Sequence, residues 1–367
     1  MAPRPLTLAD LRRYAVSRTL FAPTTLARAI DKLGFVQADP IRAPARAQDL
    51  TLRHRVRNYR AGDLERRYAK LGIEEDFFVN YGFLPRSTHA VMHPRTPRTV
   101  WTKSSQAKAD AILAFVRENG VVHPRDVDAH FQHGKTQNWF GGSSNASTQL
   151  LDGLHYRGHL RVAGRAGGVR LYVAREATPP AEDPAVAMDA LVDIIVHKYA
   201  PLPARTLSEL VYHLRSGVPQ WAAERRASLA RAARRLPSAE VDGVTWYWPQ
   251  GEDPRAARWS AGASACTDVR LLAPFDPVVW DRRRFEIFWG WQYRFEAYTP
   301  APKRVRGYYA LPLLRGDAVI GWGNLSVVEN RLRSELGYAS GKPPSGKAFK
   351  LALEEELARM SAFLGLG

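Results

Sequence analysis

The fold is decided by residues 105–132, SQAKADAILAFVRENGVVHPRDVDAHFQ. The first part has the apolar spacing of a helix that ends at Gly120, and the second opens a short helix with Pro124 at an early position. Residues 143–158 predict a third helix, capped by Ser or Asn, and residues 159–174 predict two strands around a glycine-rich turn. Three helices followed by a hairpin predict a winged helix, a variant of helix-turn-helix.

A similar succession of helices precedes this unit. Residues 6–33 have the spacing of two helices, and Thr7 stands at the N-cap position of the first. Thr24 or Thr25 caps the second helix, and Gly34 ends it. We therefore predict an N-terminal helical unit that leads into a short extended segment.

The same order of helices and a hairpin also follows the deciding stretch. Residues 185–250 have the pattern of three helices and a hairpin, and Thr206 is the predicted N-cap of the second helix. Asp242-Gly243 is a typical two-residue hairpin turn. Residues 178–184, TPPAEDP, predict a proline-rich linker between the two units.

From residue 255 onward the pattern changes to alternating aromatic and aliphatic residues, which is typical of strands. Turns are predicted at residues 300–302 and 316–317, and residues 345–365 have the spacing of a terminal helix. These features predict a small antiparallel sheet or a partly closed barrel, followed by a helix.

The fold class that follows is α+β, with tandem winged-helix domains and a C-terminal antiparallel β-domain. The predicted boundaries of three winged-helix domains and of the β-domain with its terminal helix are residues 1–104, 105–177, 185–250 and 255–367.

The chain is strongly basic. Its 53 Lys+Arg against 36 Asp+Glu give a net charge of +17, which attracts polyanions and most simply indicates nucleic acid. Ten of the 53 are lysines, which leaves 43 arginines, the side chain suited to bidentate phosphate contacts, although an Arg-rich codon bias gives the same excess.

The sequence also predicts where the protein works. Its single cysteine, Cys266, excludes an internal disulfide and a cysteine-rich zinc site. The N-terminus lacks an apolar leader, and no run of about 18 uncharged apolar residues is present. We expect a protein of the reducing bacterial cytoplasm, associated with the nucleoid.

Residues 34–40, GFVQADP, end an apolar run in two polar side chains. Side chains alternate across a strand, so Gln37 and Asp39 would point to one side, and Pro40 favours an extended conformation at Asp39. A surface polar pair, or an aspartate that caps the next turn, is the commoner interpretation of such a tripeptide. The arginines that follow favour instead a site where a nucleotide sugar is held.

At such a site a carboxylate can activate water as a general base and stabilise positive charge that develops on the sugar. The neighbouring amide can position that water. Gln37 and Asp39 are therefore the candidate catalytic residues.

Two basic segments are the predicted DNA contacts. One follows the polar pair, and the other is the predicted turn in TPAPKRVRGYY, where cationic side chains can reach phosphates or enter a groove. The candidates are Arg42, Arg46, Arg53, Arg55, Arg57, Lys303, Arg304 and Arg306. Most Trp and Tyr residues nearby are better explained as core.

Other chemistry fits the sequence less well. The ten histidines are scattered and lack the His-Glu-x-x-His spacing of a zinc hydrolase. GRAGG at residues 164–168 fits a wing turn better than a dinucleotide loop. Ser143 and Ser144 fit a helix cap better than a nucleophile, because Gly-x-Ser-x-Gly is absent. We predict no metal and no cofactor.

The order of these segments resembles the AlkX (YcaQ) and AlkZ family of DNA glycosylases over essentially the whole chain. The most specific pieces are LGFVQADPI at residues 33–41 and LLAPFDPVVWDRRRFEIFWGWQYRFEAYTPAPKRVRGYYALPLL at residues 271–314. In that family a Gln-x-Asp or Gln-x-Gln motif hydrolyses the N-glycosidic bond of bulky N7-alkylated purines, and some members unhook interstrand crosslinks. The motif falls on Gln37 and Asp39, as in the AlkX-like branch.

The resemblance implies a C-shaped array whose concave basic face holds the duplex, and monofunctional cleavage without a metal or a lysine Schiff base. One stretch departs from the family's pattern. Many members associated with crosslink unhooking carry a Trp-Ala-His-Glu-Ala-like stretch before FLP, whereas residues 77–85 here are FFVNYGFLP. Asn80 or Tyr81 stands where an acidic group is expected, so crosslink unhooking is left open beside removal of N7-alkylguanine.

The competing hypothesis is a transcription regulator or architectural protein that uses winged helices without chemistry. It explains the charge and the repeats but gives Gln37 and Asp39 no task. A sequence reader would prefer one duplex sequence, whereas a glycosylase would bind largely independently of sequence and with strong salt dependence. Self-resistance to one DNA-alkylating natural product is a biological context for the glycosylase hypothesis. No obligate protein partner is predicted.

Overall fold

The computed structural model describes residues 4–97, 99–137, 142–176, 179, 183–259 and 268–366. Most of the predicted linker, residues 178–184, and Cys266 lie outside them. The chain forms two compact units. The first unit comprises Met1–Leu64, Val192–Leu210 and Leu229–Gly367. The second comprises Glu65–Leu191 and Val211–Ser228.

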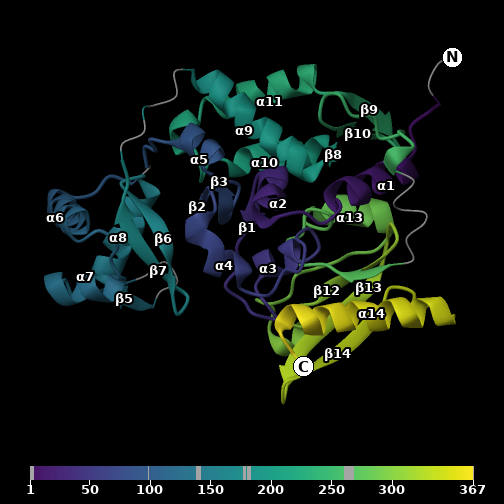
Figure 1. Ribbon diagram of the computed structural model, residues 1–367. Coiled ribbons are helices and arrows are strands. Elements are labelled where there is room, and N and C mark those ends of the chain that lie inside the picture. Colours follow the sequence, from purple (N-terminus) through teal and green to yellow (C-terminus); the bar gives the residue numbers. More distant parts are fainter. Residues whose placement is uncertain are drawn as a thin grey trace. The chain divides into compact units, whose positions relative to one another are not determined.

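Helices and antiparallel sheets make up both units, so the fold is α+β, as predicted (Figure 1). Four of the described helices run across a boundary between units along the chain: α4 (Asp63–Arg67), α9 (Pro184–Tyr199), α10 (Ala204–His213) and α11 (Glu224–Arg235). Among the described helices, none is both long enough and apolar enough to cross a membrane.

The N-terminal helices begin and end where their capping residues predict. α1 (Leu8–Thr19) starts after Thr7, whose side chain and backbone complete a capping box. α2 (Leu26–Leu33) starts after Thr25, which resolves the choice between two threonines. Gly34 ends α2 with a φ of 64°, a left-handed conformation that glycine adopts without a Cβ penalty. The extended segment that carries the polar pair therefore starts from a fixed point.

The rest of the first unit is built on two sheets. A three-stranded sheet has the order β8-β10-β9 and a four-stranded sheet the order β11-β12-β13-β14, with antiparallel pairing throughout. The elements are β1 (Val36–Gln37), α3 (Ala47–Leu52), β8 (Leu202–Pro203), β9 (Ser238–Val241), β10 (Val244–Tyr247), β11 (Val269–Leu271), α13 (Arg282–Trp289), η3 (Ala301–Lys303), β12 (Leu311–Arg315), β13 (Ala318–Val328), β14 (Arg331–Tyr338) and α14 (Lys347–Leu364). α14 lies across the four-stranded sheet (Figure 1).

Two local predictions in this unit are confirmed. Asp242 and Gly243 have φ values of 50° and 72°, as the turn between β9 and β10 requires. The terminal helix is present as α14, and β12 and β13 are joined through residues 316–317.

The prediction of strands from residue 255 onward is wrong for residues 272–310, which contain turns, α13 and η3 but no strand. α13 has a clear local cause. The Asp281 side chain accepts hydrogen bonds from the backbone N–H groups of Arg283 and Arg284, and Gly290 ends the helix in a left-handed conformation. These two caps outweigh the strand preference of the aromatic residues between them. The prediction that Thr206 caps a helix is also wrong, because α10 begins at Ala204.

Thr206 has another task. Its hydroxyl is buried and donates to the carboxylate of Asp281. It therefore supports the residue that caps α13 rather than its own helix.

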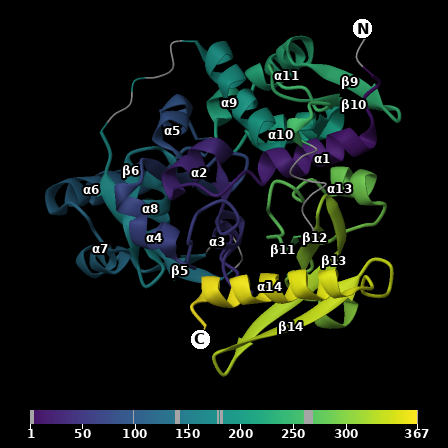
Figure 2. The same ribbon diagram turned by 45° about the vertical axis from the view of Figure 1, so that its right-hand side comes forward.

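One hydrophobic core joins the two ends of the chain within the first unit. Val16 of α1 packs in a cluster with Leu272, Phe285 of α13 and Leu314 of β12. Figure 2 shows α1 beside α13, and the two helices are in contact. The N-terminal helix α1 is therefore held against C-terminal elements of the same unit.

The second unit contains the helices and the hairpin of the deciding stretch, in the predicted order. They are α6 (Lys103–Asn119), α7 (Pro124–Phe131), α8 (Ala146–Tyr156), β6 (Leu160–Ala166) and β7 (Val169–Ala174). The remaining elements are η1 (Tyr68–Lys70), β2 (Ile73–Phe77), β3 (Tyr81–Pro85), α5 (Arg86–Met92), β4 (Lys135–Gln137), β5 (Ser143–Asn145) and η2 (Pro219–Trp221). The winged-helix assignment and the four predicted domains stay predictions.

Candidate active site

All of the predicted catalytic and DNA-contact residues fall in the first unit. Gln37 is the last residue of β1 and is only 7% exposed. Its Oε1 accepts a hydrogen bond of 3.0 Å from the indole Nε1 of Trp280. An indole N–H can only donate, so it fixes which end of the amide is oxygen. The two N–H donors of Gln37 are thereby directed away from Trp280.

Asp39 lies just beyond the strand, because β1 ends two residues earlier. Its Oδ1 accepts from the backbone N–H of Ile41 at 2.9 Å, which forms an Asx turn across Pro40. Its own backbone N–H donates to Oε1 of Gln48 in α3 at 3.2 Å. The position of Asp39 therefore depends on this turn. It does not depend on the alternation of side chains along a strand, from which the direction of Asp39 was predicted.

Asp39 is buried, with 8% of the residue exposed. Burial raises its pKa above the ordinary aspartate value, and the hydrogen bond from Ile41 only partly offsets this effect. A carboxylate held in this way is a stronger base than one in water. It can accept a proton or stabilise a neighbouring positive charge, and these are the two roles that the sequence analysis predicts for this carboxylate.

The polar pair rests on a buried lysine that the sequence did not single out. The Nζ of Lys198 donates to the backbone carbonyl of Phe35, two residues before Gln37. Burial and, after it, the nearby Arg55 lower the pKa of Lys198 to about 7, against the opposing effect of Asp276. Lys198 thus supports the start of the segment that carries the motif.

Two of the predicted DNA-contact arginines belong to the interior. Arg55 is 0% exposed and forms a two-pronged ion pair with Asp276, at 2.7 and 2.9 Å. The side chain of Arg53 is 4% exposed and pairs with the buried Glu356 of α14. Since neither guanidinium reaches the surface, we assign both to the stability of the fold rather than to DNA contact.

The other arginines after the motif are accessible. Arg42 and Arg57 are exposed, and Arg46 is half-buried. These three side chains stay predicted DNA contacts.

The second basic segment forms a loop around η3, before β12. Lys303 is exposed. Arg304 is half-buried, donates to the carbonyl of Thr299 at 2.8 Å and lies 5.0 Å from the ring centre of Tyr308. The loop also exposes Tyr298 and Val305, at 80% and 75%. A cationic and apolar surface of this kind suits a nucleic-acid groove.

Arg306 is placed differently from its neighbours. Its guanidinium lies 5.2 Å from the ring centre of Trp291 and 5.3 Å from that of Trp322. Burial lowers its pKa, against the opposing effect of Glu296. This packing anchors the loop to the sheet, which leaves Lys303 and Arg304 better placed for contact.

Tyr309 is the second residue after the basic loop's Gly307. Burial and, after it, the charge of Asp39 raise the pKa of Tyr309 well above its ordinary value, so the motif and the basic loop are electrostatically coupled. The sequence did not indicate Trp280 and Gln48, because no local pattern marks a residue that contacts the motif from another segment.

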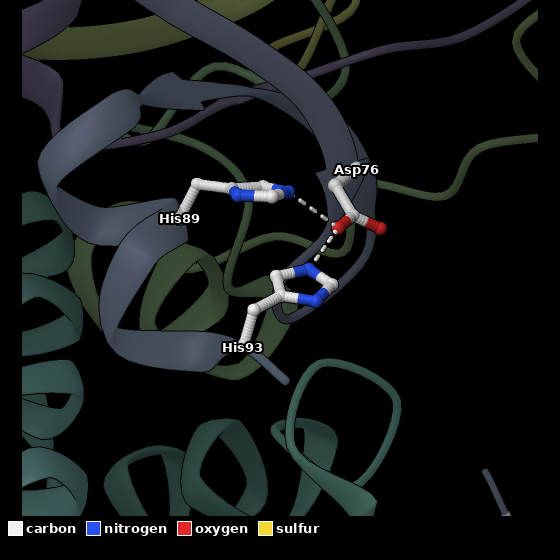
Figure 3. A group of neighbouring side chains, drawn as sticks. All are labelled: Asp76, His89 and His93. Atoms are coloured by element: carbon white, nitrogen blue, oxygen red, sulfur yellow. Dashed lines mark hydrogen bonds and ion pairs between the residues drawn. The ribbon is translucent and has the colours of Figure 1, made fainter. Parts of the chain in front are cut away.

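A separate cluster in the second unit has the composition of a metal site. Oδ2 of Asp76 lies 2.9 Å from Nε2 of both His89 and His93 (Figure 3). Arg95 also donates to this carboxylate, at 3.0 and 3.2 Å. The guanidinium already neutralises the charge that would attract a cation, so the arrangement fits an ion-pair cluster better than a metal centre.

Protonation states support that interpretation. Burial lowers the pKa of His89 to about 3 and that of His93 to about 4, despite the hydrogen bonds that both rings make to Asp76. Burial raises the pKa of Asp76, but Arg95 and the two histidines outweigh it, so this pKa lies well below its usual range. Neutral imidazoles can donate Nε2–H to an ionised carboxylate, which accounts for both histidine contacts of Asp76 without an ion.

Comparison with known proteins adds two findings to this geometry. A family model described as "DNA glycosylase AlkZ-like" matches residues 30–363. Among solved structures, the DNA glycosylase AlkZ of Streptomyces sahachiroi is similar, with a TM-score of 0.62 and 16% identity over 99% of this chain and 98% of that one. At that identity the structural likeness shows a shared fold.

Proposed function

The chain belongs to the AlkZ-like DNA glycosylase family, and from that premise we propose that it hydrolyses the N-glycosidic bond of N7-alkylated purines in duplex DNA. The observation that carries the proposal is the placement of Gln37 and Asp39. One side chain offers directed N–H donors, and the other is a buried carboxylate with a raised pKa. The net charge of +17 supports DNA as the substrate.

The reaction follows from the charge of the lesion. An alkyl group on N7 makes the purine cationic, so the base departs readily with the electron pair of its bond to C1′ and leaves as a neutral molecule. Positive charge develops on the sugar, and the Asp39 carboxylate stabilises it. Gln37 donates an N–H to a water molecule, whose oxygen attacks C1′ while a proton passes to Asp39. The products are the free alkylpurine and an abasic site.

A water nucleophile also fits the buried lysine. Lys198 is 3% exposed, and its Nζ donates to the Phe35 carbonyl. Lys198 therefore already has a structural role, which is to hold the backbone that leads into the motif. We therefore propose monofunctional hydrolysis rather than a lysine Schiff base.

The test is release of N7-methylguanine from duplex DNA by the full chain, measured under single-turnover conditions, with unhooking of a nitrogen-mustard crosslink as a second substrate. Release of the methylated base supports the proposal, and the crosslink result defines how bulky a lesion is accepted. Release of neither, together with a strong preference for one duplex sequence, would support a DNA-binding regulator instead.

Trp280→Phe removes the donor that orients Gln37. We expect the single-turnover rate to fall about 10- to 100-fold, because a misplaced group costs rate in this range. DNA affinity is expected to stay the same. Trp289→Phe is the matched control, since its indole also donates at 3.0 Å but to the backbone carbonyl of Asp317 instead of the motif. Equal losses in both variants would contradict the role given to Trp280.

Lys303→Ala removes an exposed cation from the basic loop. We expect weaker binding on all duplex sequences and a slope of log Kd against log salt that is smaller by about 1. Binding is measured by fluorescence anisotropy at several salt concentrations. Lys350→Ala, an exposed lysine of α14, is the control and should leave the slope unchanged. An unchanged slope in Lys303→Ala would remove this residue from the interface.

A further inference from the structure

Arg284 is a buried arginine of α13 whose guanidinium joins two separate segments of backbone. The residue is 1% exposed. Its Nη1 donates to the carbonyls of Tyr199 and Pro201, the second at 3.1 Å. Its Nη2 donates to the carbonyls of Pro277 and Val278, again the second at 3.1 Å. Each of these nitrogens carries two N–H donors, so each is fully used on one segment.

The segment bound by Nη2 leads to the residue that orients the catalytic amide. Residues 277–278 precede Trp280, whose indole donates to Oε1 of Gln37 at 3.0 Å. The guanidinium of Arg284 thus fixes the backbone two residues before that indole. Because the bond from the indole is directional, a shift of this backbone would move the donor away from Gln37.

The segment bound by Nη1 reaches the same strand from α9. Residues 199–201 follow Lys198, which donates to the carbonyl of Phe35, directly before β1. The ring of Tyr199 also packs against Trp280, with ring centroids 5.1 Å apart. The two segments and the motif strand therefore form a closed ring of contacts, and this contact ring lies entirely within the first unit.

Fold stability alone does not explain an arginine at this position. Burying a charge is costly, and burial lowers the pKa of Arg284, against the opposing effect of Asp281. Arg55 offsets this cost with a two-pronged ion pair to Asp276, whereas the four bonds from Arg284 end on neutral carbonyls. A planar guanidinium can nevertheless hold two segments at one fixed spacing, which an apolar side chain cannot do.

We propose that Arg284 is a positioning residue that holds the Trp280 indole against the Gln37 amide. It does so by tying residues 277–278 to residues 199–201. The effect on catalysis rests on the proposed function, in which Gln37 directs the attacking water. The contact ring itself does not rest on it. Since Arg284 is buried, it acts on the rate and not on the binding of DNA.

The direct test is Arg284→Lys in the full chain, which keeps the charge but places all donors on one nitrogen. A single ammonium cannot bridge the two segments, so the Trp280 indole should lose its fixed position. Its N–H signal, assigned by its absence in Trp280→Phe, is followed by nitrogen–proton correlation NMR. We expect a changed chemical shift and faster hydrogen exchange, whereas the Trp248 indole, which donates to the carbonyl of Glu252, should keep its signal. An unchanged Trp280 signal would overturn the proposal.

The rate of base release gives the second readout. On N7-methylguanine duplex we expect Arg284→Lys to lower the single-turnover rate about tenfold, because misplacement of a group costs rate even when its cause lies away from the substrate. The Kd for DNA should stay the same. Combined with Trp280→Phe, Arg284→Lys should add little, since both act through one contact. A wild-type rate in folded Arg284→Lys, or losses that multiply fully, would overturn the positioning role.

Glu356→Gln separates lost stability from lost position. It weakens the buried ion pair with Arg53, so the melting temperature should fall while the rate and the Trp280 signal stay normal. If this variant changes the rate and the signal as Arg284→Lys does, the proposal is overturned.

The wild type carries the test if Arg284→Lys does not fold. A guanidinium held by four carbonyls cannot rotate freely, so the Nη protons of Arg284 should give separate NMR signals. Signals averaged by rapid rotation would overturn the proposal.

The NMR readouts do not depend on activity, so two failures are distinguishable. A Trp280 signal that responds to Arg284→Lys in a protein that releases no base would support the contact ring and overturn the proposed function. Base release by a protein whose Trp280 signal does not respond would support the glycosylase and overturn the role of Arg284.

Discussion

Asp39→Asn is expected to lower the rate of N7-methylguanine release by about 10²- to 10⁴-fold, the contribution typical of a general base. Asparagine has nearly the same shape and keeps an oxygen that can accept from the Ile41 N–H, so the turn across Pro40 is preserved. It loses the negative charge and the ability to take a proton. DNA affinity should stay nearly the same, and full activity of the variant would remove Asp39 from the mechanism.

The stability of this variant provides an internal control. Burial raises the pKa of Asp39, so the folded state binds the proton more tightly than the unfolded state. Stability therefore falls as pH rises through the interval between the unfolded and folded pKa values, and above it the ionised carboxylate is a net cost. Asp39→Asn removes that cost. We expect a melting temperature at neutral pH that is equal to or higher than that of the wild type, so lost activity would not reflect unfolding.

The same raised pKa sets the pH dependence of the wild-type rate. Asp39 must be ionised to act as a base, so activity should fall as pH drops through its folded pKa. The acid limb is expected at a pH above 3.8, the ordinary value for this carboxyl group. Spontaneous acid loss of the alkylated base is subtracted with a protein-free duplex. A rate that is independent of pH down to 3.8 would show that Asp39 ionisation does not limit the reaction.

Local chemistry explains what could be predicted from the sequence. Thr7, Gly34 and the Asp242-Gly243 turn act on the backbone within a few residues, and each lies where its pattern indicated. The prediction failed for α13 because its aromatic residues favour a strand, whereas its caps favour a helix. A decision of that kind depends on tertiary packing, which composition does not record.

In the candidate site too, features that are local in the sequence could be predicted, and contacts between distant residues could not. The polar pair is adjacent in sequence, so it could be found, but the residue that orients Gln37 lies 243 positions away. The arginines were identified by charge alone, and charge does not show whether a side chain is exposed. Arg55 is separated from Asp276 by 221 positions, and only the fold reveals that they meet. Its assignment to the interior has a testable energetic consequence.

Asp276→Leu is expected to lower the free energy of unfolding by about 3–5 kcal/mol, because it leaves the Arg55 guanidinium buried without a counter-charge. The wild-type carboxylate accepts two hydrogen bonds from Arg55 and one from the backbone N–H of Val278 at 3.0 Å. Urea denaturation followed by circular dichroism measures the effect. Glu355→Gln, which breaks an exposed i,i+4 pair with Arg359, should cost at most about 0.5 kcal/mol.

Replacing both partners distinguishes a buried ion pair from a DNA contact. Arg55→Met combined with Asp276→Leu should be more stable than Asp276→Leu alone, since no charge is then left buried without a partner. Arg55→Met should leave the salt dependence of DNA binding unchanged, because a side chain that is 0% exposed releases no counterions from phosphate. A salt slope reduced by about 1 in folded Arg55→Met would instead place this arginine on the DNA and require the interior around Asp276 to open when the duplex binds.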